Sequence, residues 1–360
     1  MPRLSITAAV ALALCLLAGR PAYADDPPPP PADAAADTTS VPVPAGPPPA
    51  PAHAAALPTP AAAALAAPPG PEAEAAARTR RWWGIGIGAG VPVGILSVGF
   101  VNWWLSHRIN FDLSRFHTRP RGWFGADTHV GGHDNVGHMF ANYVVQAEVG
   151  RMFENIGYSR GRSALYATLV TSFTFNMVEL LDAFTDYGWE YSDTVFNALG
   201  QAAGLVTHLY DFDRYAQLRI SWLPSKLYLD GGIPRYEVVE DYGGQRFYLV
   251  ANSAGIADAT GVELGPARYL MPGVFYDTRG YRPALDPARY AQRERNLGVA
   301  VLIDVSALVR DRWPQAPWAR RTARVLRYFQ PPFLGLAYGY DLNHSRWHVP
   351  DYTLTLSGRF

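Results

Sequence analysis

Charged and amide side chains recur at helical spacing inside three otherwise apolar segments of the sequence. Asp134 and His138 are four residues apart, and Asp193 and Asn197 repeat that spacing. Residues three or four apart share one face of a helix, so these side chains are expected to point into a common interior. Buried carboxylates need a hydrogen-bonding, ionic or metal partner, which makes this polar network the candidate site. Its members are Asp134, His138, Glu179, Asp182, Asp186, Asp193 and Asn197.

Two interpretations of the polar network stay open. In the first, His138, Glu179 and Asp182 supply one nitrogen and two oxygen ligands to a divalent metal, Zn or Fe(II), with positions left for water. The metal-activated water would hydrolyse an ester or phosphoester bond, of a lipid for example. In the second, the network fixes the register of the helices, and Asp134 and Asp193 act as N-terminal caps.

The second interpretation is favoured, because the sequence contains no nucleophile elbow, phosphate-binding loop or zinc-protease motif. It requires no cofactor, and it leaves no residue assigned as catalytic. We therefore expect a non-enzymatic protein and keep the metal-dependent hydrolase as the alternative.

The segments that carry the network have helical periodicity. Apolar residues recur at helical spacing in residues 135–152, 163–184 and 192–209, which predicts three helices in the core of a first domain. A fourth apolar segment, residues 84–105, contains no charged residue. Its length suits a membrane span, but its glycines alternate as in a strand, so a buried helix, a lipid-inserted helix and a barrel strand all remain open.

After residue 213 the apolar pattern changes to a period of two. Large apolar residues alternate with small or polar ones in segments that predict about six strands. His344 and His348 are expected to flank a turn before the last strand. The fold class is therefore α+β, with about four helices followed by an antiparallel sheet or partial barrel. The predicted strands are residues 218–222, 247–252, 269–276, 297–305, 334–340 and 352–356.

One face of the predicted sheet is large and apolar, and the other is small or polar. In a soluble sheet the apolar face would pack on the helices, whereas in an outer-membrane barrel it would face lipid. Six strands fall short of the eight in the smallest bacterial barrels. A helix-backed or partly membrane-docked sheet is therefore favoured over a closed barrel.

The first 24 residues have the order of a secretory signal. Arg3 precedes an apolar run, and the small residues Ala22 and Ala24 precede Asp25. Cleavage after Ala24 would remove Cys15, the one cysteine of the sequence, and would exclude disulfides and thiolate metal sites. We expect an exported, periplasmic protein.

The next 54 residues, 25–78, contain 16 prolines and 20 alanines. Such a segment has too few large apolar side chains to offset the entropy cost of folding, which predicts a disordered linker. The expected organisation is a signal peptide at 1–24, the linker at 25–78, a helical domain at 79–213 and a β region at 214–360.

The charge balance argues against a nucleic-acid partner. Lysine and arginine number 31, and aspartate and glutamate also number 31, so the formal net charge is zero. A polyanion-binding protein carries an excess of basic residues. With the export signal and the amphipathic sheet, the expected partner is membrane lipid or the outer-membrane surface, and the identity of any envelope protein partner is unknown.

Short motifs follow one another in a characteristic order: Asp134-Asn-Val-Gly-His138, Glu179-Leu-Leu-Asp182, Ser192-Asp193, Asn197-Ala-Leu-Gly200, Arg219-Ile-Ser-Trp222 and Asp241-Tyr-Gly-Gly-Gln245-Arg-Phe-Tyr248. This order resembles the YfiM-like family of predicted periplasmic lipoproteins of unknown function, and is more distantly similar to VanZ-like helical proteins. Members of this family usually carry lysine where Asn135 stands, and many have a lipid-attachment motif that this sequence lacks. The resemblance implies an envelope location and a helical domain followed by strands, and it implies no activity.

Overall fold

The structure is a computed structural model. It describes residues 70–105, 116–118, 122–185, 187–233, 238–281 and 293–350, and at 102–105 it describes the backbone alone. The predicted signal peptide, the linker up to residue 69, Asp186 and the predicted strand at 352–356 lie outside the described residues. Residues 21–79 form a unit separate from the remainder of the chain, and only residues 70–79 of this unit are described.

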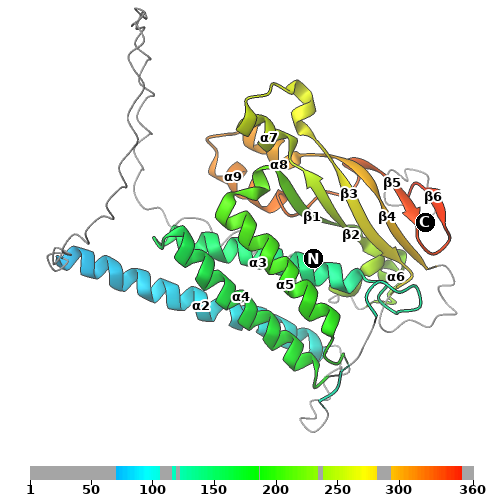
Figure 1. Cartoon of the computed structure of the whole chain (residues 1–360), viewed down its shortest axis with the longest axis horizontal. Helices are drawn as coiled ribbons and strands as arrows, with labels where there is room; N and C mark the ends of the chain where they lie inside the picture. Colours follow the sequence, from blue (N-terminus) through cyan, green and yellow to red (C-terminus); the bar gives the residue numbers. More distant parts are fainter. Residues whose placement is uncertain are drawn as a thin grey trace, which may run out of the picture. The chain divides into compact units, whose positions relative to one another are not determined.

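Within the described residues, four long helices form the helical part: α2 (Pro71–Leu105), α3 (His133–Asn155), α4 (Arg160–Asp182) and α5 (Tyr191–Tyr210) (Figure 1). The three helices predicted from periodicity are confirmed, and residues 84–105 are helical, so the strand alternative for that segment was wrong. Helix α2 begins at Pro71, so the last eight residues of the predicted linker, 71–78, are helical. Proline suits the first position of a helix because its missing N–H has no partner there.

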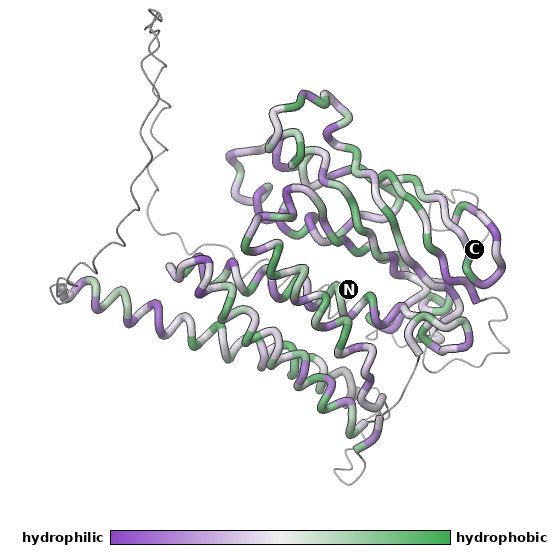
Figure 2. Tube along the Cα trace, viewed as in Figure 1, coloured by the Kyte–Doolittle hydropathy of each residue, from purple (hydrophilic) through white to green (hydrophobic). Residues whose placement is uncertain are grey.

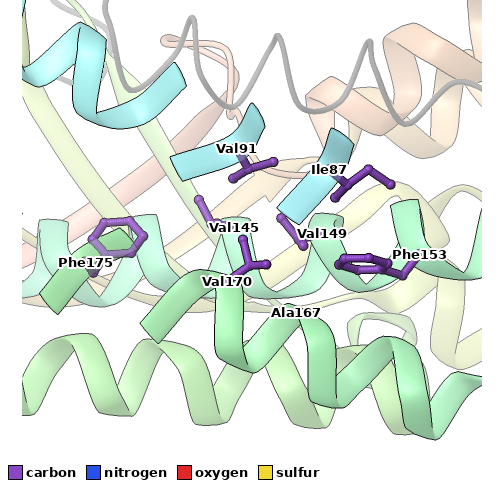
Figure 3. Close-up of a cluster of buried hydrophobic side chains, with 8 residues drawn as sticks. All are labelled: Ile87, Val91, Val145, Val149, Phe153, Ala167, Val170 and Phe175. Atoms are coloured by element: carbon purple, nitrogen blue, oxygen red, sulfur yellow. The ribbon is translucent and has the colours of Figure 1, made fainter. Parts of the chain in front are cut away.

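Helix α3 packs against α2 and α4 through a compact apolar cluster. Ile87 and Val91 of α2 contact residues from the middle of α3 and from α4 (Figure 3). By length and composition, α2 and α4 are each sufficient to cross a membrane, although a buried core helix meets the same criterion. The remaining cluster members are Val145, Val149, Phe153, Ala167, Val170 and Phe175.

The strands form one open antiparallel sheet in which each strand pairs with its neighbour in the sequence. This confirms the α+β class, with a helical part followed by a sheet. Residues 346–348 form a short strand that pairs with β5, so the turn predicted between His344 and His348 was wrong there. Three residues are too few to show an alternating pattern. The strands are β1 (Ala216–Trp222), β2 (Gln245–Ala251), β3 (Leu270–Arg279), β4 (Glu294–Ile303), β5 (Gly335–Asp341) and β6 (Arg346–His348).

Short helices that the sequence patterns did not reveal join the strands. Helix α6 (Lys226–Leu229) follows β1, and α7 (Ser253–Thr260) follows β2, while α8 (Val305–Arg312) and α9 (Pro317–Leu326) lie between β4 and β5. Asp304 caps α8 by accepting a hydrogen bond at Oδ1 from the Ala307 N–H, 3.1 Å away. Helices α7, α8 and α9 therefore gather at one end of the strands. The 3₁₀ segments are Phe212–Arg214, Val238–Glu240, Tyr242–Gly244 and Gly265–Tyr269.

The exposed face of the sheet is the apolar one, which is the reverse of an ordinary soluble sheet. Leu249, Val274, Val299 and Tyr338 face one another across four consecutive strands, yet their side chains are 45% to 56% exposed. Figure 2 shows hydrophobic residues along these strands. We call this surface the apolar sheet face, and its members are Leu249, Leu270, Val274, Leu297, Val299, Val301, Leu336, Tyr338 and Trp347.

The opposite face of the sheet is buried, although it carries charged residues. Arg246 donates a hydrogen bond from Nε to Asp277 Oδ2 at 2.5 Å, and Arg219 donates from Nη2 to Asp304 Oδ1 at 3.0 Å. The same face carries a buried apolar cluster of Tyr248, Val250, Met271, Phe275, Ala300, Leu302 and Ala337. Gln330 bonds the edge of β1 through its backbone N–H and bonds Arg219 through its side chain, so the segment around it covers this face.

Helix α3 covers only one edge of the apolar side of the sheet. The Phe247 ring lies 5.8 Å from that of Phe140, and Leu218 and Ile220 of β1 pack into the same cluster. The expectation of a sheet whose apolar face packs on the helices therefore holds for β1 and for Phe247 of β2. From Leu249 of β2 to Trp347 of β6, the apolar sheet face stays exposed.

Candidate functional site

The polar network lies where α3, α4 and α5 meet. Asp134 and His138 occupy the first two turns of α3, and Glu179 lies near the end of α4. Asp193 and Asn197 occupy the first two turns of α5. The start of α3, the end of α4 and the start of α5 thus bring five of the seven predicted site residues together.

Two glycines allow α5 to approach α3 closely enough for these contacts. A Cβ atom at Gly200 would collide with the carbonyl oxygen of Met139, and one at Gly204 would lie 2.6 Å from the carbonyl oxygen of Tyr143. Glycine is therefore required at both positions by packing rather than by backbone conformation. The close approach places Asn197, one turn earlier on α5, against His138.

The two ring nitrogens of His138 have different surroundings. Nδ1 lies 3.1 Å from Asn197 Oδ1 and 3.3 Å from Glu179 Oε1. Both neighbours are acceptors, so Nδ1 carries a proton. Nε2 faces two other carboxylates, with Asp193 Oδ2 at 3.8 Å and Asp134 Oδ1 at 4.0 Å.

Burial alone would lower the pKa of His138, but the carboxylates oppose it. Asp193, Glu179 and Asp134 each favour the charged ring, and together they raise the pKa from 6.5 to about 10. The His138 side chain is 19% exposed, so the site is not sealed from solvent. At neutral pH this histidine is an imidazolium that partly balances three carboxylates.

Amide side chains extend the network toward the middle of the helices. Asn142 Nδ2 donates to Asn197 Oδ1, and Asn197 Nδ2 donates to Glu179 Oε1 at 2.9 Å. Gln201 Nε2 donates to Asn142 Oδ1 at 3.1 Å, and Ser172 Oγ donates to Gln201 Oε1 at 2.6 Å. These consecutive hydrogen bonds hold each side chain in one orientation.

Sequence reasoning missed these three amide and hydroxyl residues and also missed Tyr242, whose hydroxyl donates to Asp134 Oδ1 at 3.0 Å. Asn142 lies four residues after His138, and Gln201 lies four residues after Asn197. Extending the same helical spacing by one turn would have found both. Tyr242 comes from the segment before β2, and no spacing on the helices indicates it.

The predicted metal ligands are arranged differently from the expected set. Among the described residues, the ligand atoms close enough to share one ion belong to Asp134, His138 and Asp193, within 4.8 Å of one another. Glu179 lies on the other side of the ring, at Nδ1. Asp182 ends α4 and its backbone carbonyl accepts from the Gly188 N–H at 2.9 Å; its side chain is not part of this group. Asp186 lies outside the described residues.

The prediction that Asp134 and Asp193 are helix caps was wrong. The N-caps of α3 and α5 are Gly132 and Glu190, and neither helix has a side-chain cap hydrogen bond. Asp134 and Asp193 lie two and three residues after these caps, in the first turn, where their negative charges interact favourably with the helix dipole and also face His138.

The comparisons with known proteins match one part of the chain. Residues 120–209 match the model of DUF2279, a family described as predicted periplasmic lipoproteins. Neither the curated proteins nor the solved structures include a match to this chain. The matched segment spans α3 to α5 and contains every helical residue of the network, while the sheet lies outside it. The match supports an exported, periplasmic protein and fits the expected lipoprotein family.

Proposed function

We propose that this chain is a non-enzymatic envelope protein that contacts membrane lipid through its apolar sheet face, at the periplasmic surface of the outer membrane. The observation that supports this most directly is the distribution of side chains on the sheet. Large apolar side chains are exposed on one face, and arginine–aspartate pairs are buried on the other. Exposed apolar area costs about 25 cal/mol per Å² relative to burial. A continuous apolar surface on a folded chain therefore marks a contact with another apolar phase.

Outer-membrane strands alternate in the same sense, apolar toward lipid and polar toward the interior. The apolar sheet face follows β3 from Leu270 to the level of Tyr276, which is roughly 20 Å at about 3.3 Å per residue. That length is below the ~25 Å apolar band of a transmembrane barrel. It supports partial immersion of one face rather than a complete span.

Vesicle flotation of the purified chain tests the proposal. The wild-type chain should float with phosphatidylcholine vesicles. The triple variant Val274→Thr, Val299→Thr and Leu336→Thr should bind at least about tenfold more weakly, because three apolar side chains no longer enter the lipid. These side chains are 45%, 56% and 63% exposed, and threonine keeps the strand preference of a β-branched residue, so the fold should be retained.

A matched control changes exposed apolar residues outside the apolar sheet face. Leu229 on α6 is 52% exposed and Val239 is 39% exposed. Leu229→Gln with Val239→Thr should leave flotation unchanged. A wild-type chain that stays at the bottom of the gradient as a folded monomer would overturn the proposal, and so would equal binding by the triple variant.

A second candidate function is favoured by the arrangement around His138. Nδ1 points to Glu179 and Nε2 faces Asp134 and Asp193, which is the arrangement in which a second carboxylate orients a metal-bound histidine. We propose as the alternative that Asp134, His138 and Asp193 bind a divalent metal such as Zn or Fe. Its bound water would hydrolyse a lipid ester or phosphoester.

Metal analysis separates this alternative from the first proposal. The chain loaded with zinc should retain about one ion after dialysis, and His138→Ala and Asp193→Asn should each abolish retention while helicity is kept. Asp230→Asn, at an exposed carboxylate paired with Lys226, is the matched control and should retain the ion. A folded wild-type chain that binds no zinc, manganese or iron would contradict the metal-binding alternative.

A further inference from the structure

Arginines without carboxylate partners lie on α8 and α9, beside two exposed tryptophans. Arg312, Arg320 and Arg321 are exposed, and none of them forms an ion pair within the described part of the chain. The rings of Trp313 and Trp318 are 44% and 51% exposed, with centroids 5.1 Å apart. The guanidinium of Arg312 lies 5.7 Å from the Trp313 ring. We call these five residues the α8–α9 surface.

Other arginines near the same helices are already neutralised. Arg268 lies 2.9 Å from Asp258, and Arg310 lies 3.0 Å from Asp311. Arg327 turns inward and donates to Asp213. The positive charge that remains for a ligand on α8 and α9 is therefore concentrated on the α8–α9 surface.

At the opposite end of the sheet, the exposed arginine of β6 is paired with carboxylates. Arg346 lies 2.9 Å from Glu294 and 3.6 Å from Asp341. An exposed tryptophan, Trp347, lies on the same strand and is 57% exposed. The charge of Arg346 is thus already paired, unlike the charges of Arg312, Arg320 and Arg321.

The α8–α9 surface belongs to helices that follow the end of β4, at one end of the strands. Helix α8 starts directly after β4 at Asp304, and Ser306 Oγ donates to the Ala323 carbonyl at 2.8 Å, which joins α8 to α9. Val301 and Leu336 pair across β4 and β5 near this end and are 43% and 63% exposed. The rim of a lipid-contacting face lies at headgroup depth, where tryptophan and arginine are the favoured side chains.

We propose that the α8–α9 surface binds the phosphate groups of anionic phospholipids, which orients the apolar sheet face on the membrane. The inference rests on the proposed lipid contact and adds the class of lipid. Guanidinium groups pair with phosphate oxygens in a fixed fork geometry, and the exposed indole rings insert between headgroups. A chain of zero net charge with three clustered unpaired arginines fits a headgroup layer better than a long polyanion.

Flotation on two kinds of vesicle tests this inference. The wild-type chain should bind phosphatidylcholine vesicles containing phosphatidylglycerol more tightly than pure phosphatidylcholine vesicles, and salt should reduce the difference. Each arginine near an anionic surface contributes about fivefold in binding, so Arg320→Gln with Arg321→Gln should weaken binding to the anionic vesicles roughly 30-fold. Binding of this double variant to neutral vesicles should stay at the wild-type value.

Arg162→Gln is the matched control, since Arg162 is exposed at the start of α4 and has no ion-pair partner among the described residues. It should leave both affinities unchanged. Equal binding of wild type to both vesicles overturns the headgroup inference while the lipid-contact proposal stands. Retained anionic preference in the double variant also overturns it, because the preference then arises elsewhere. Failure to bind either vesicle overturns both proposals.

Discussion

Asn197 donates a hydrogen bond from Nδ2 to Glu179 Oε1 at 2.9 Å, while its Oδ1 lies 3.1 Å from Nδ1 of His138. One amide of α5 therefore joins α4 and α3 at the same point. The side chains of Asn197 and Glu179 are both buried, so this hydrogen bond is shielded from solvent. This relationship fixes the orientation of the His138 ring.

Asn197→Ala should therefore lower the free energy of unfolding by about 2 to 3 kcal/mol, because it removes a hydrogen-bond donor from the buried Glu179 carboxylate and an acceptor from Asn142 Nδ2 and His138 Nδ1. Urea denaturation measures the loss. Asn176→Ala is the matched control: Asn176 is exposed and its Nδ2 donates to the Ser172 carbonyl on the same helix. That change should cost less than about 0.5 kcal/mol. Equal losses at the two positions would mean that the network does not stabilise the helices.

Gly200→Ala should destabilise the chain although alanine is the better helix former. The new Cβ would meet the Met139 carbonyl and would lie 2.8 Å from the Asn142 Cβ, forcing α3 and α5 apart. Overpacking of this kind costs about 1 to 3 kcal/mol, which exceeds the gain of roughly 1 kcal/mol in helix propensity.

The same substitution at Gly86 of α2 is the control, because its added Cβ would have no atom within 4 Å. Gly86→Ala should stabilise the chain by about 0.5 to 1 kcal/mol. Thermal unfolding of the two variants should thus shift in opposite directions. Stabilisation by Gly200→Ala would show that a Cβ atom fits between α3 and α5 and would contradict the close packing of these helices.

The helices and the larger strands follow from periodicity because each buries one face over several turns or residues. Residues 135–152 predicted α3, and 297–305 predicted β4, within a few residues of their observed bounds. Helices α8 and α9 were missed because they are short, rich in arginine and largely exposed. Their place in the fold depends on caps such as Asp304 and on contacts with each other, which a periodic pattern does not contain.

The candidate site was predictable only in part. Helical spacing found Asp134, His138, Asp193 and Asn197, because each pair lies on one face of its own helix. Spacing along one helix says nothing about distances between helices, so the sequence could not tell that Glu179 faces Nδ1 while Asp193 faces Nε2.

The sequence also showed which side of the sheet is apolar but left two possibilities for what covers it. Exposure follows from how far α3 reaches across β1 and β2, through contacts such as Phe140 with Phe247. The strand pattern contains no information about that reach, since packing on helices and contact with lipid favour the same alternation.

The buried pair Arg246–Asp277 should be sensitive to loss of one partner. Both side chains are at most 3% exposed, and Asn296 Nδ2 donates to Asp277 Oδ1 at 2.8 Å. Arg246→Met should lower the free energy of unfolding by about 3 to 5 kcal/mol, because it leaves a buried carboxylate without its cation. Arg246→Met combined with Asp277→Leu should recover much of that loss.

The exposed pair Lys226–Asp230 provides the comparison, with 76% and 46% of the two side chains exposed. Lys226→Met should change stability by less than about 0.5 kcal/mol, since exposed pairs are screened by solvent. Guanidinium denaturation of the four chains measures the difference. If the double variant were as unstable as Arg246→Met alone, the charge of Asp277 would not be the cause of the loss.

The stability of the metal-free chain should fall as pH rises above neutrality because of His138. Its charged ring faces Asp134 on its own helix, Glu179 on α4, and Asp193 on α5, which raise its pKa to about 10 against 6.5 in an unfolded chain. Between these values the folded chain binds the extra proton, so the contribution to stability is fully present below about pH 6.5 and is lost as pH rises through 10. In chelator-treated protein, the free energy of unfolding of the wild type should exceed that of His138→Gln. This difference should shrink by on the order of 1 to 3 kcal/mol as the pH rises across this range. His117 is exposed, so His117→Gln should show the same dependence of unfolding free energy on pH as the wild type. The same pH dependence in His138→Gln would contradict the role given to His138.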